Sequence, residues 1–174
     1  MNQQSSNQKP SEEEYAGDAG DYIRLVPEGD IIGILLAQGN QMTELLASLT
    51  EEQGSYRYAE GKWSLKEVAG HIIDSERVMT YRLLRFSRGD QTPLSSFDQE
   101  LFLPPFENWT MAQLAEDYQA VRQATITLLR GLPEEAWTRS GTANGSSITV
   151  RALAYGCAGH ELHHVGIIRN RYLR

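Results

Sequence analysis

The chain contains four histidines, and three of them lie close together in the stretch Gly159–His164. On an α-helix each residue turns about 100° and rises about 1.5 Å, so His160 and His164 lie about 40° and roughly one turn apart. Two imidazoles at this i,i+4 spacing can converge on one metal ion. The alternative is a pair of hydrogen-bonded histidines in or beside a core, because an H-x-x-x-H pattern alone is only moderately specific.

The apolar face of the same predicted helix separates the three histidines. His164 points almost along the inward direction, His160 lies at the edge of that face, and His163 faces well away from it. His160 and His164 are therefore the candidate ligands, and His163 is expected at the surface or at an interface. The inward direction is defined by Val150, Leu153, Ala154, Cys157, Ile167 and Ile168.

The fourth histidine, His71, lies on the flank of an earlier predicted helix, beside its apolar stripe. His71 lies at a distance from the start of its helix that would let it reach the level of His160 and His164 if the two helices pack together. Three neutral imidazoles and a water form a catalytic zinc site with one open position. We therefore predict a metal site made by His71, His160 and His164, at which a metal-bound water or thiol would be the reactive group.

Residues beside these histidines could support the site. Ligating histidines usually donate their second N–H to a carboxylate or carbonyl, and Asp74 and Glu161 are near in sequence but on different helix faces from the adjacent histidine. Backbone carbonyls or exposed salt bridges explain them equally well. Cys157, one turn before His160, could be a fourth ligand, although a buried single cysteine is more often a small apolar residue.

Arg82 lies on the same flank of its predicted helix as His71. It could bind an anionic substrate, or it could pair with an acid of the third helix such as Glu116 or Asp117, and we take the pairing as the default. The chain has no glycine-rich phosphate loop and no G-x-S-x-G nucleophile motif.

Helical periodicity and capping residues predict an all-α fold, a four-helix bundle with a long connection between the second and third helices. The connection, residues 90–109, is proline-rich and aromatic; we expect it to plug one end of the bundle rather than form a lid over a site. Residues 138–147 are expected to form a loop. The predicted helices cover residues 31 to about 52, 65 to about 88, 111 to about 129 and 150 to about 173, with Asp30, Ser64, Thr110 and Thr149 as N-caps and with capping boxes at Ser64/Glu67 and Thr110/Gln113.

Length and composition limit the other classes of function. The 174 residues fit one domain, residues 22–174, preceded by a flexible or loosely docked arm, residues 1–21. The net charge is −7 and the basic residues are not clustered, so nucleic-acid binding is not expected. No run of eighteen apolar residues and no secretory signal is present, and the single cysteine fits a reducing compartment, so a cytoplasmic protein that does not span a membrane is expected.

Several stretches together resemble the DinB-like superfamily, most closely its YfiT-like branch. That resemblance implies a four-helix bundle with a three-histidine metal site, its ligands falling on His71, His160 and His164, and Zn²⁺ or Ni²⁺ as the metal. The matching stretches are Lys62–Ser64, Gly70–Arg77, Tyr81-Arg82, Arg88–Asp90, Phe97–Gln99, Gly141–Gly145, Val150–Leu153 and Gly159–His164.

The resemblance also implies an activity. Relatives include bacillithiol-dependent thiol-S-transferases and a mycothiol-dependent isomerase, which favours a metal-dependent transferase that activates a low-molecular-weight thiol, such as bacillithiol, for attack on an electrophilic small molecule. The alternatives are a metal-dependent hydrolase using metal-bound hydroxide and a non-catalytic module with a structural metal.

The last predicted helix is apolar nearly all round, so several of its sides need cover. The N-terminal arm, another helix or a second subunit could provide that cover, and we favour a homodimer. The residues away from its core face are Tyr155, Leu162, Val165 and Leu173.

Overall fold

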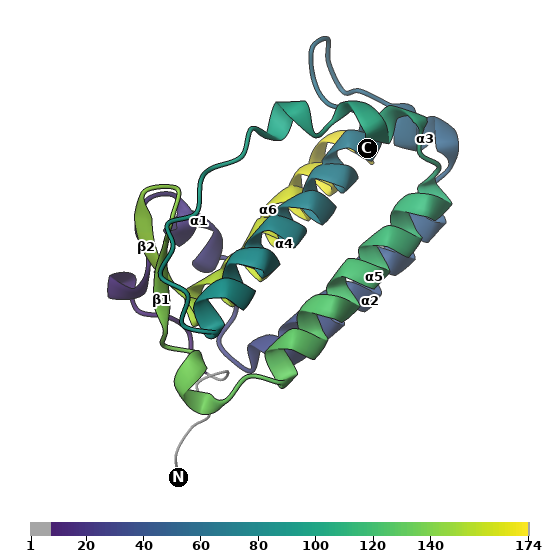
Figure 1. Cartoon of the computed structure of the whole chain (residues 1–174). Coiled ribbons are helices and arrows are strands. Elements are labelled where there is room, and N and C mark those ends of the chain that lie inside the picture. Colours follow the sequence, from purple (N-terminus) through teal and green to yellow (C-terminus); the bar gives the residue numbers. More distant parts are fainter. Residues whose placement is uncertain (1–7, 174) are drawn as a thin grey trace.

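Four long helices form a bundle in the computed structural model, which describes residues 8–173 (Figure 1). Helix α2 (Ile31–Ser48) packs on α5 (Met111–Arg130), and α4 (Leu65–Ser87) packs on both α5 and α6 (Val150–Ile167). The connection from α4 returns the chain to the end where α4 began, so α4 and α5 run in the same direction (Figure 1). The predicted four-helix bundle with a long second connection is confirmed.

The predicted N-caps close the starts of these helices. The Asp30 carboxylate accepts hydrogen bonds from two backbone N–H groups of α2. Ser64 with Glu67, and Thr110 with Gln113, form complete capping boxes at the starts of α4 and α5. Each cap satisfies N–H groups that the first helical turn leaves without a partner.

One predicted helix end is wrong. The first helix does not continue to residue 52, because α2 ends at Ser48 and a separate short helix, α3 (Glu51–Ser55), begins after Thr50. Thr50 and Gln53 form a capping box of their own, which starts the new helix. At the C-terminus the helical segment does reach the predicted end near residue 173, but its last part is a π-helical turn, η6 (Ile168–Tyr172), that follows α6 directly.

The expected loop at residues 138–147 is instead largely a β-hairpin. Strand β1 (Ser140–Ala143) pairs antiparallel with β2 (Ser146–Thr149), with Ala143 opposite Ser146. The turn is Asn144-Gly145, with φ of 52° and 75°, which is the Asn-Gly turn that two-residue hairpins favour. Small polar residues concealed this signal in the sequence.

The connection between α4 and α5 passes beside α4, from the hairpin towards the end of the bundle that carries α3 (Figure 1). Leu94 donates its N–H to Thr142 of the hairpin at 2.9 Å. Two short 3₁₀ turns follow, η3 (Gln99–Leu101) and η4 (Pro104–Asn108). The Phe106 ring of η4 packs so closely on Gly70 of α4 that a Cβ atom at residue 70 would lie 2.3 Å from it. The connection thus covers one side of α4 rather than a single end of the bundle.

An N-terminal segment covers α6. It contains a 3₁₀ turn, η2 (Glu12–Glu14), and a short helix, α1 (Ala19–Ile23), which packs on α6. Arg151 donates to Glu14, and a Cβ at Gly159 would lie 2.1 Å from the Tyr22 carbonyl oxygen. The predicted boundary between arm and domain at residue 22 falls inside α1 and remains a prediction, and residues 1–7 of that arm lie outside the described residues.

A buried polar layer crosses the middle of the bundle. Each long helix supplies one member, Gln38, Glu76, Arg122 or Glu161, and in each helix that residue falls between the residues of two separate apolar clusters. The apolar core therefore has two halves, one on either side of the layer. Within residues 8–173 no helix combines the length and apolarity that crossing a membrane would require.

Candidate metal centre

The structure brings His71 of α4 together with His160 and His164 of α6. One ring nitrogen from each lies within 4.8 Å of the others, and the Nε2 atoms of His71 and His160 are 3.0 Å apart. His71 and His160 are only 6% and 8% exposed, whereas His164 is partly exposed. The cluster therefore sits at the edge of the core with one open side.

The three imidazoles fit a tetrahedral metal ion. Zinc–nitrogen distances of about 2.0–2.1 Å place neighbouring ligand nitrogens about 3.3 Å apart; the His71 and His160 nitrogens are 3.0 Å apart, and all three nitrogens lie within 4.8 Å of one another. Burial lowers the pKa of His71 to about 4. Burial, and then the neighbouring histidines, lower the pKa of His160 to about 2 and that of His164 to about 3. All three are thus neutral at pH 7, with lone pairs available for a cation.

A hydroxyl and an indole surround His71. The Ser75 Oγ lies 3.4 Å from its Nδ1, which leaves Nε2 directed at the other histidines. The Trp63 ring packs against the imidazole with centroids 5.1 Å apart. Contacts of this kind fix the orientation of a ligating histidine.

His163 lies outside the cluster, as the helical geometry predicts. It is exposed, and its ring packs edge-on against Tyr22 at 5.5 Å. The same tyrosine contacts the ring of His160 at 5.3 Å. Helix α1 therefore covers one flank of the site, a contribution that the sequence analysis missed because nothing in the sequence of α1 marks its partner.

The other residues singled out near the histidines have partners elsewhere. Asp74 accepts from Arg77 at 3.1 Å, and burial raises its pKa. Glu161 accepts from Tyr118 at 2.6 Å. Cys157 is only 2% exposed, burial raises its pKa, and among the described residues no metal-type cluster includes it. No hydrogen bond within residues 8–173 joins any of these three to an imidazole.

Glu161 belongs to a buried ion-pair network that the sequence analysis missed. The Arg122 guanidinium donates to Glu76 at 2.7 Å, to Glu161 at 2.6 Å and to the Leu35 carbonyl oxygen at 3.0 Å. Burial alone would lower the pKa of Arg122, but the two carboxylates outweigh it and raise that pKa. The only sequence signal was a charged residue beside the apolar stripe of α5, four positions after Tyr118.

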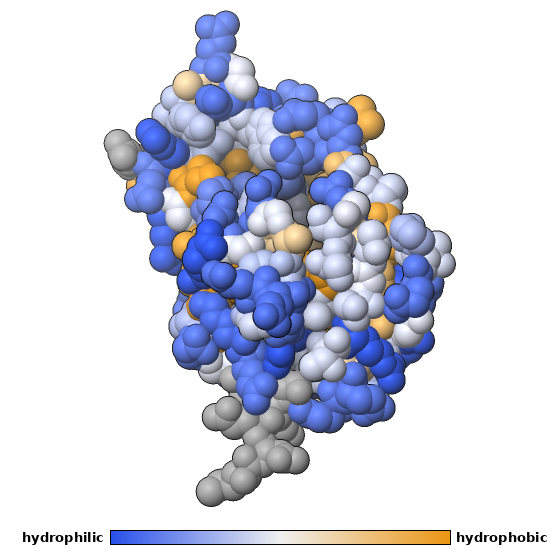
Figure 2. All heavy atoms as spheres, turned by 90° about the vertical axis from the view of Figure 1, so that its left-hand side faces the viewer, coloured by the Kyte–Doolittle hydropathy of each residue, from blue (hydrophilic) through white to orange (hydrophobic). Residues whose placement is uncertain are grey.

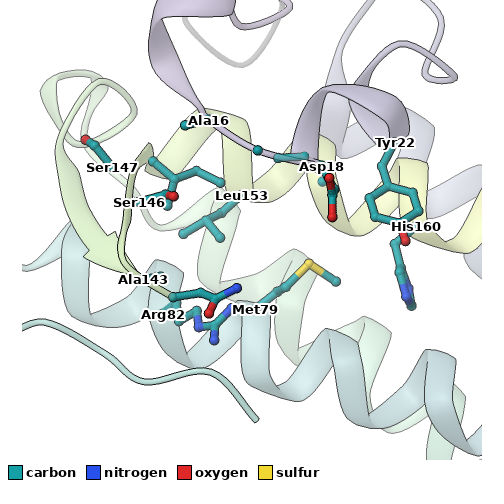
Figure 3. Close-up of a pocket in the computed structure, with 15 residues that line it drawn as sticks. Ala16, Asp18, Tyr22, Met79, Arg82, Ala143, Ser146, Ser147, Leu153 and His160 are labelled. Atoms are coloured by element: carbon teal, nitrogen blue, oxygen red, sulfur yellow. The ribbon is translucent and has the colours of Figure 1, made fainter. Parts of the chain in front are cut away.

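A cavity of about 330 Å³ opens beside the histidines, bounded by α1, α4, the β-hairpin and α6. His160 lies at one end and Arg82 at the other, with Met79 between them (Figure 3). The predicted pairing of Arg82 with Glu116 or Asp117 is wrong, because within residues 8–173 Arg82 donates to the Ser95 carbonyl oxygen and forms no ion pair, and Asp117 accepts from Arg77 at 2.9 Å. The face of the molecule turned to the viewer in Figure 2 is largely polar, with apolar side chains in small patches.

The lowered histidine pKa values predict the acid sensitivity of the metal-free protein. Below about pH 6.5 the histidines of the unfolded chain become protonated. In the folded protein the same histidines stay neutral until about pH 4 or lower. Stability should therefore fall with falling pH, by about 1.4 kcal/mol per pH unit for each histidine. Urea unfolding of chelator-treated protein between pH 7 and pH 5 measures this slope. Replacing His71 and His164 by alanine should remove about two thirds of the histidine contribution, and an unchanged slope would contradict it.

The comparisons with known proteins identify the family. The family profile of the DinB superfamily matches residues 34–168. This match covers most of the chain, and the chain belongs to the DinB superfamily, as its motifs predicted.

Two curated proteins and one solved structure are similar to the chain. A protein of Oceanobacillus iheyensis named "putative metal-dependent hydrolase" is 30% identical over 134 residues, 75% of this chain and 76% of the relative. The uncharacterized protein YjoA of Bacillus subtilis is 27% identical over 139 residues, 78% of this chain and 82% of the relative. The structure of YfiT from Bacillus subtilis, described as "a probable metal-dependent hydrolase with an unusual four-helix bundle topology", matches with a TM-score of 0.68 and 20% identity, covering 94% of this chain and 90% of that one.

Proposed function

We propose that this protein is a metal-dependent hydrolase of small molecules, with His71, His160 and His164 holding a divalent ion, Zn²⁺ or Ni²⁺. The observation that carries the proposal is a cluster of three neutral imidazoles, one of which, His160, lines a neighbouring cavity. A closed structural site would instead place a fourth side chain there. The name of the relative from Oceanobacillus iheyensis supports the same reaction class.

The chain itself would supply orientation and shielding. Ser75 and Trp63 hold the His71 ring, and Tyr22 covers the His160 ring. When bound, the ion would lower the pKa of a coordinated water or thiol and so make a nucleophile available at neutral pH. The substrate would enter through the cavity, whose walls limit it to a small molecule.

Thiol transfer is the second candidate function. The same donor set would activate a low-molecular-weight thiol such as bacillithiol, as the family resemblance implies. The two reactions differ in their requirement: hydrolysis proceeds without any thiol, and transfer does not.

The experiment is an activity comparison on zinc-loaded and nickel-loaded protein. Activated esters and amides are assayed without thiol, and epoxides and alkyl halides are assayed with and without bacillithiol, with the His71→Ala variant as the inactive control. Thiol-independent turnover that disappears in the variant supports hydrolysis. Turnover only with thiol supports transfer, and equal rates in the variant would refute both.

The homodimer was predicted because α6 is apolar on several sides, and part of that apolar surface is covered within the chain itself. Tyr155 is fully buried, and its hydroxyl donates to the Gly29 carbonyl oxygen at 2.9 Å, so the N-terminal segment covers part of that surface. Leu162, Val165 and Leu173 remain only partly covered. The dimer stays a proposal, and sedimentation equilibrium at working concentration tests it.

A further inference from the structure

We infer that Arg82 binds an oxyanion, a carboxylate or a phosphate, at the end of the substrate remote from the metal centre. The inference rests on the proposed function, because it takes the cavity beside His160 as the substrate site. It adds the substrate class: an elongated small molecule with a reactive group at one end, an apolar middle and a terminal anion.

Arg82 has the environment of an anion-binding residue. It is half-buried in the cavity wall, and burial lowers its pKa without any compensating acid. Its one hydrogen bond within the described chain goes to the Ser95 carbonyl oxygen at 2.8 Å, and it has no ion pair with a described carboxylate. A guanidinium offers five N–H donors, so most of them are free for a ligand.

The cavity separates the two ends of such a substrate. Arg82 follows His71 by eleven residues on α4, a rise of about 16 Å along the helix axis. The arginine side chain leans back towards the start of α4 and shortens this gap. Met79 lies between Arg82 and His160, and Leu153 lies at the Arg82 end of the cavity (Figure 3), so an aliphatic spacer joining the two ends of a ligand would contact Met79.

Two further groups fix which end of the cavity takes the anion. Ser146 of the hairpin lies at the Arg82 end, and its hydroxyl has no hydrogen bond to another residue of the described chain (Figure 3). Asp18 lies on the opposite wall, nearer Tyr22 and His160 (Figure 3). Its negative charge disfavours an anion beside the histidines and favours one at Arg82.

Calorimetry on the zinc-loaded full chain tests the inference with thiols of matched length. The ligands are ω-mercaptohexanoate, ω-mercaptohexyl phosphate and the neutral ω-mercaptohexanol, with mercaptoacetate and mercaptoethanol as a pair too short to reach Arg82. We expect the better of the two long anions to bind at least about tenfold more tightly than the alcohol, since a hydrogen bond to a charged group contributes that much. The carboxylate and phosphate arms decide which oxyanion the site prefers.

Three variants locate the effect. The long-anion preference should disappear in Arg82→Gln, persist in part in Arg82→Lys, and remain intact in Arg88→Gln, which changes an exposed arginine of the same helix end. The short pair should show no dependence on Arg82. Circular dichroism and zinc content establish that each variant is folded and loaded.

Equal affinity of the long anions and the alcohol, failure of both long anions to bind, or equal losses in Arg82→Gln and Arg88→Gln would overturn the inference. The proposed function fails separately, through zinc content that does not depend on His71 and His164 or through the absence of any metal-dependent turnover.

Discussion

Replacing His71 and His164 together by alanine should abolish stoichiometric zinc binding. Two of the three imidazoles that converge within 4.8 Å are then missing, and the remaining His160 offers a single nitrogen. Removing a residue that merely orients a ligand costs about 10–100-fold in metal affinity, so losing two ligands should cost more than about 100-fold. Plasma mass spectrometry of zinc-loaded, desalted protein measures the metal bound per chain.

The matched control for this loss is His163→Ala. His163 is adjacent to His164 but exposed and outside the cluster, so this variant should keep the wild-type zinc content. Stoichiometric zinc in the double variant, or loss of zinc in His163→Ala, would show that the ligands have been assigned wrongly.

Replacing Arg122 by methionine should lower the free energy of unfolding by about 3–5 kcal/mol. Glu76 and Glu161 both depend on its guanidinium, and the side chains of all three residues are at most 4% exposed. Without Arg122 the two carboxylates stay buried with no cation between them, and the Leu35 carbonyl loses its donor. Urea denaturation followed by circular dichroism measures the loss.

Arg77→Met is the matched control, because Arg77 also joins α4 to α5 but is 45% exposed at its side chain. Exposed pairs contribute about 0–1 kcal/mol, so this variant should be nearly as stable as the wild type. Adding Glu76→Gln and Glu161→Gln to Arg122→Met should recover part of the stability, because the stranded charges are then removed. An Arg122→Met variant no less stable than Arg77→Met would mean that the network does not hold the bundle together.

Local sequence signals predicted the long helices well because helix starts depend on neighbouring residues. Ser64 and Glu67 satisfy each other's backbone N–H groups within one turn, wherever the helix lies in the fold. The Asn144-Gly145 turn is an equally local signal, but the strands beside it are short and polar, so the sequence there resembles a loop. These features need no tertiary information.

The partners of the charged residues could not be predicted in this way. Each of Arg77, Arg82 and Arg122 is an arginine within a predicted helix, so the sequence does not distinguish them. In the structure Arg77 makes a surface ion pair, Arg82 lines a cavity and Arg122 is buried between two carboxylates. The difference depends on how far each helix is rotated and shifted against its neighbours. Packing of the two apolar clusters fixes that rotation, and it involves residues far apart in the chain.

Helical spacing alone predicts that His160 and His164 share one helix face and that His163 does not, because the turn of about 100° per residue is a property of the backbone. Capping residues likewise predict where the helices carrying the histidines begin. The contact of His71 with these histidines, the packing of Tyr22 on His160 and the cavity between His160 and Arg82 become visible only in the folded chain. Those contacts join helices far apart in the sequence, and core packing sets their depth and rotation.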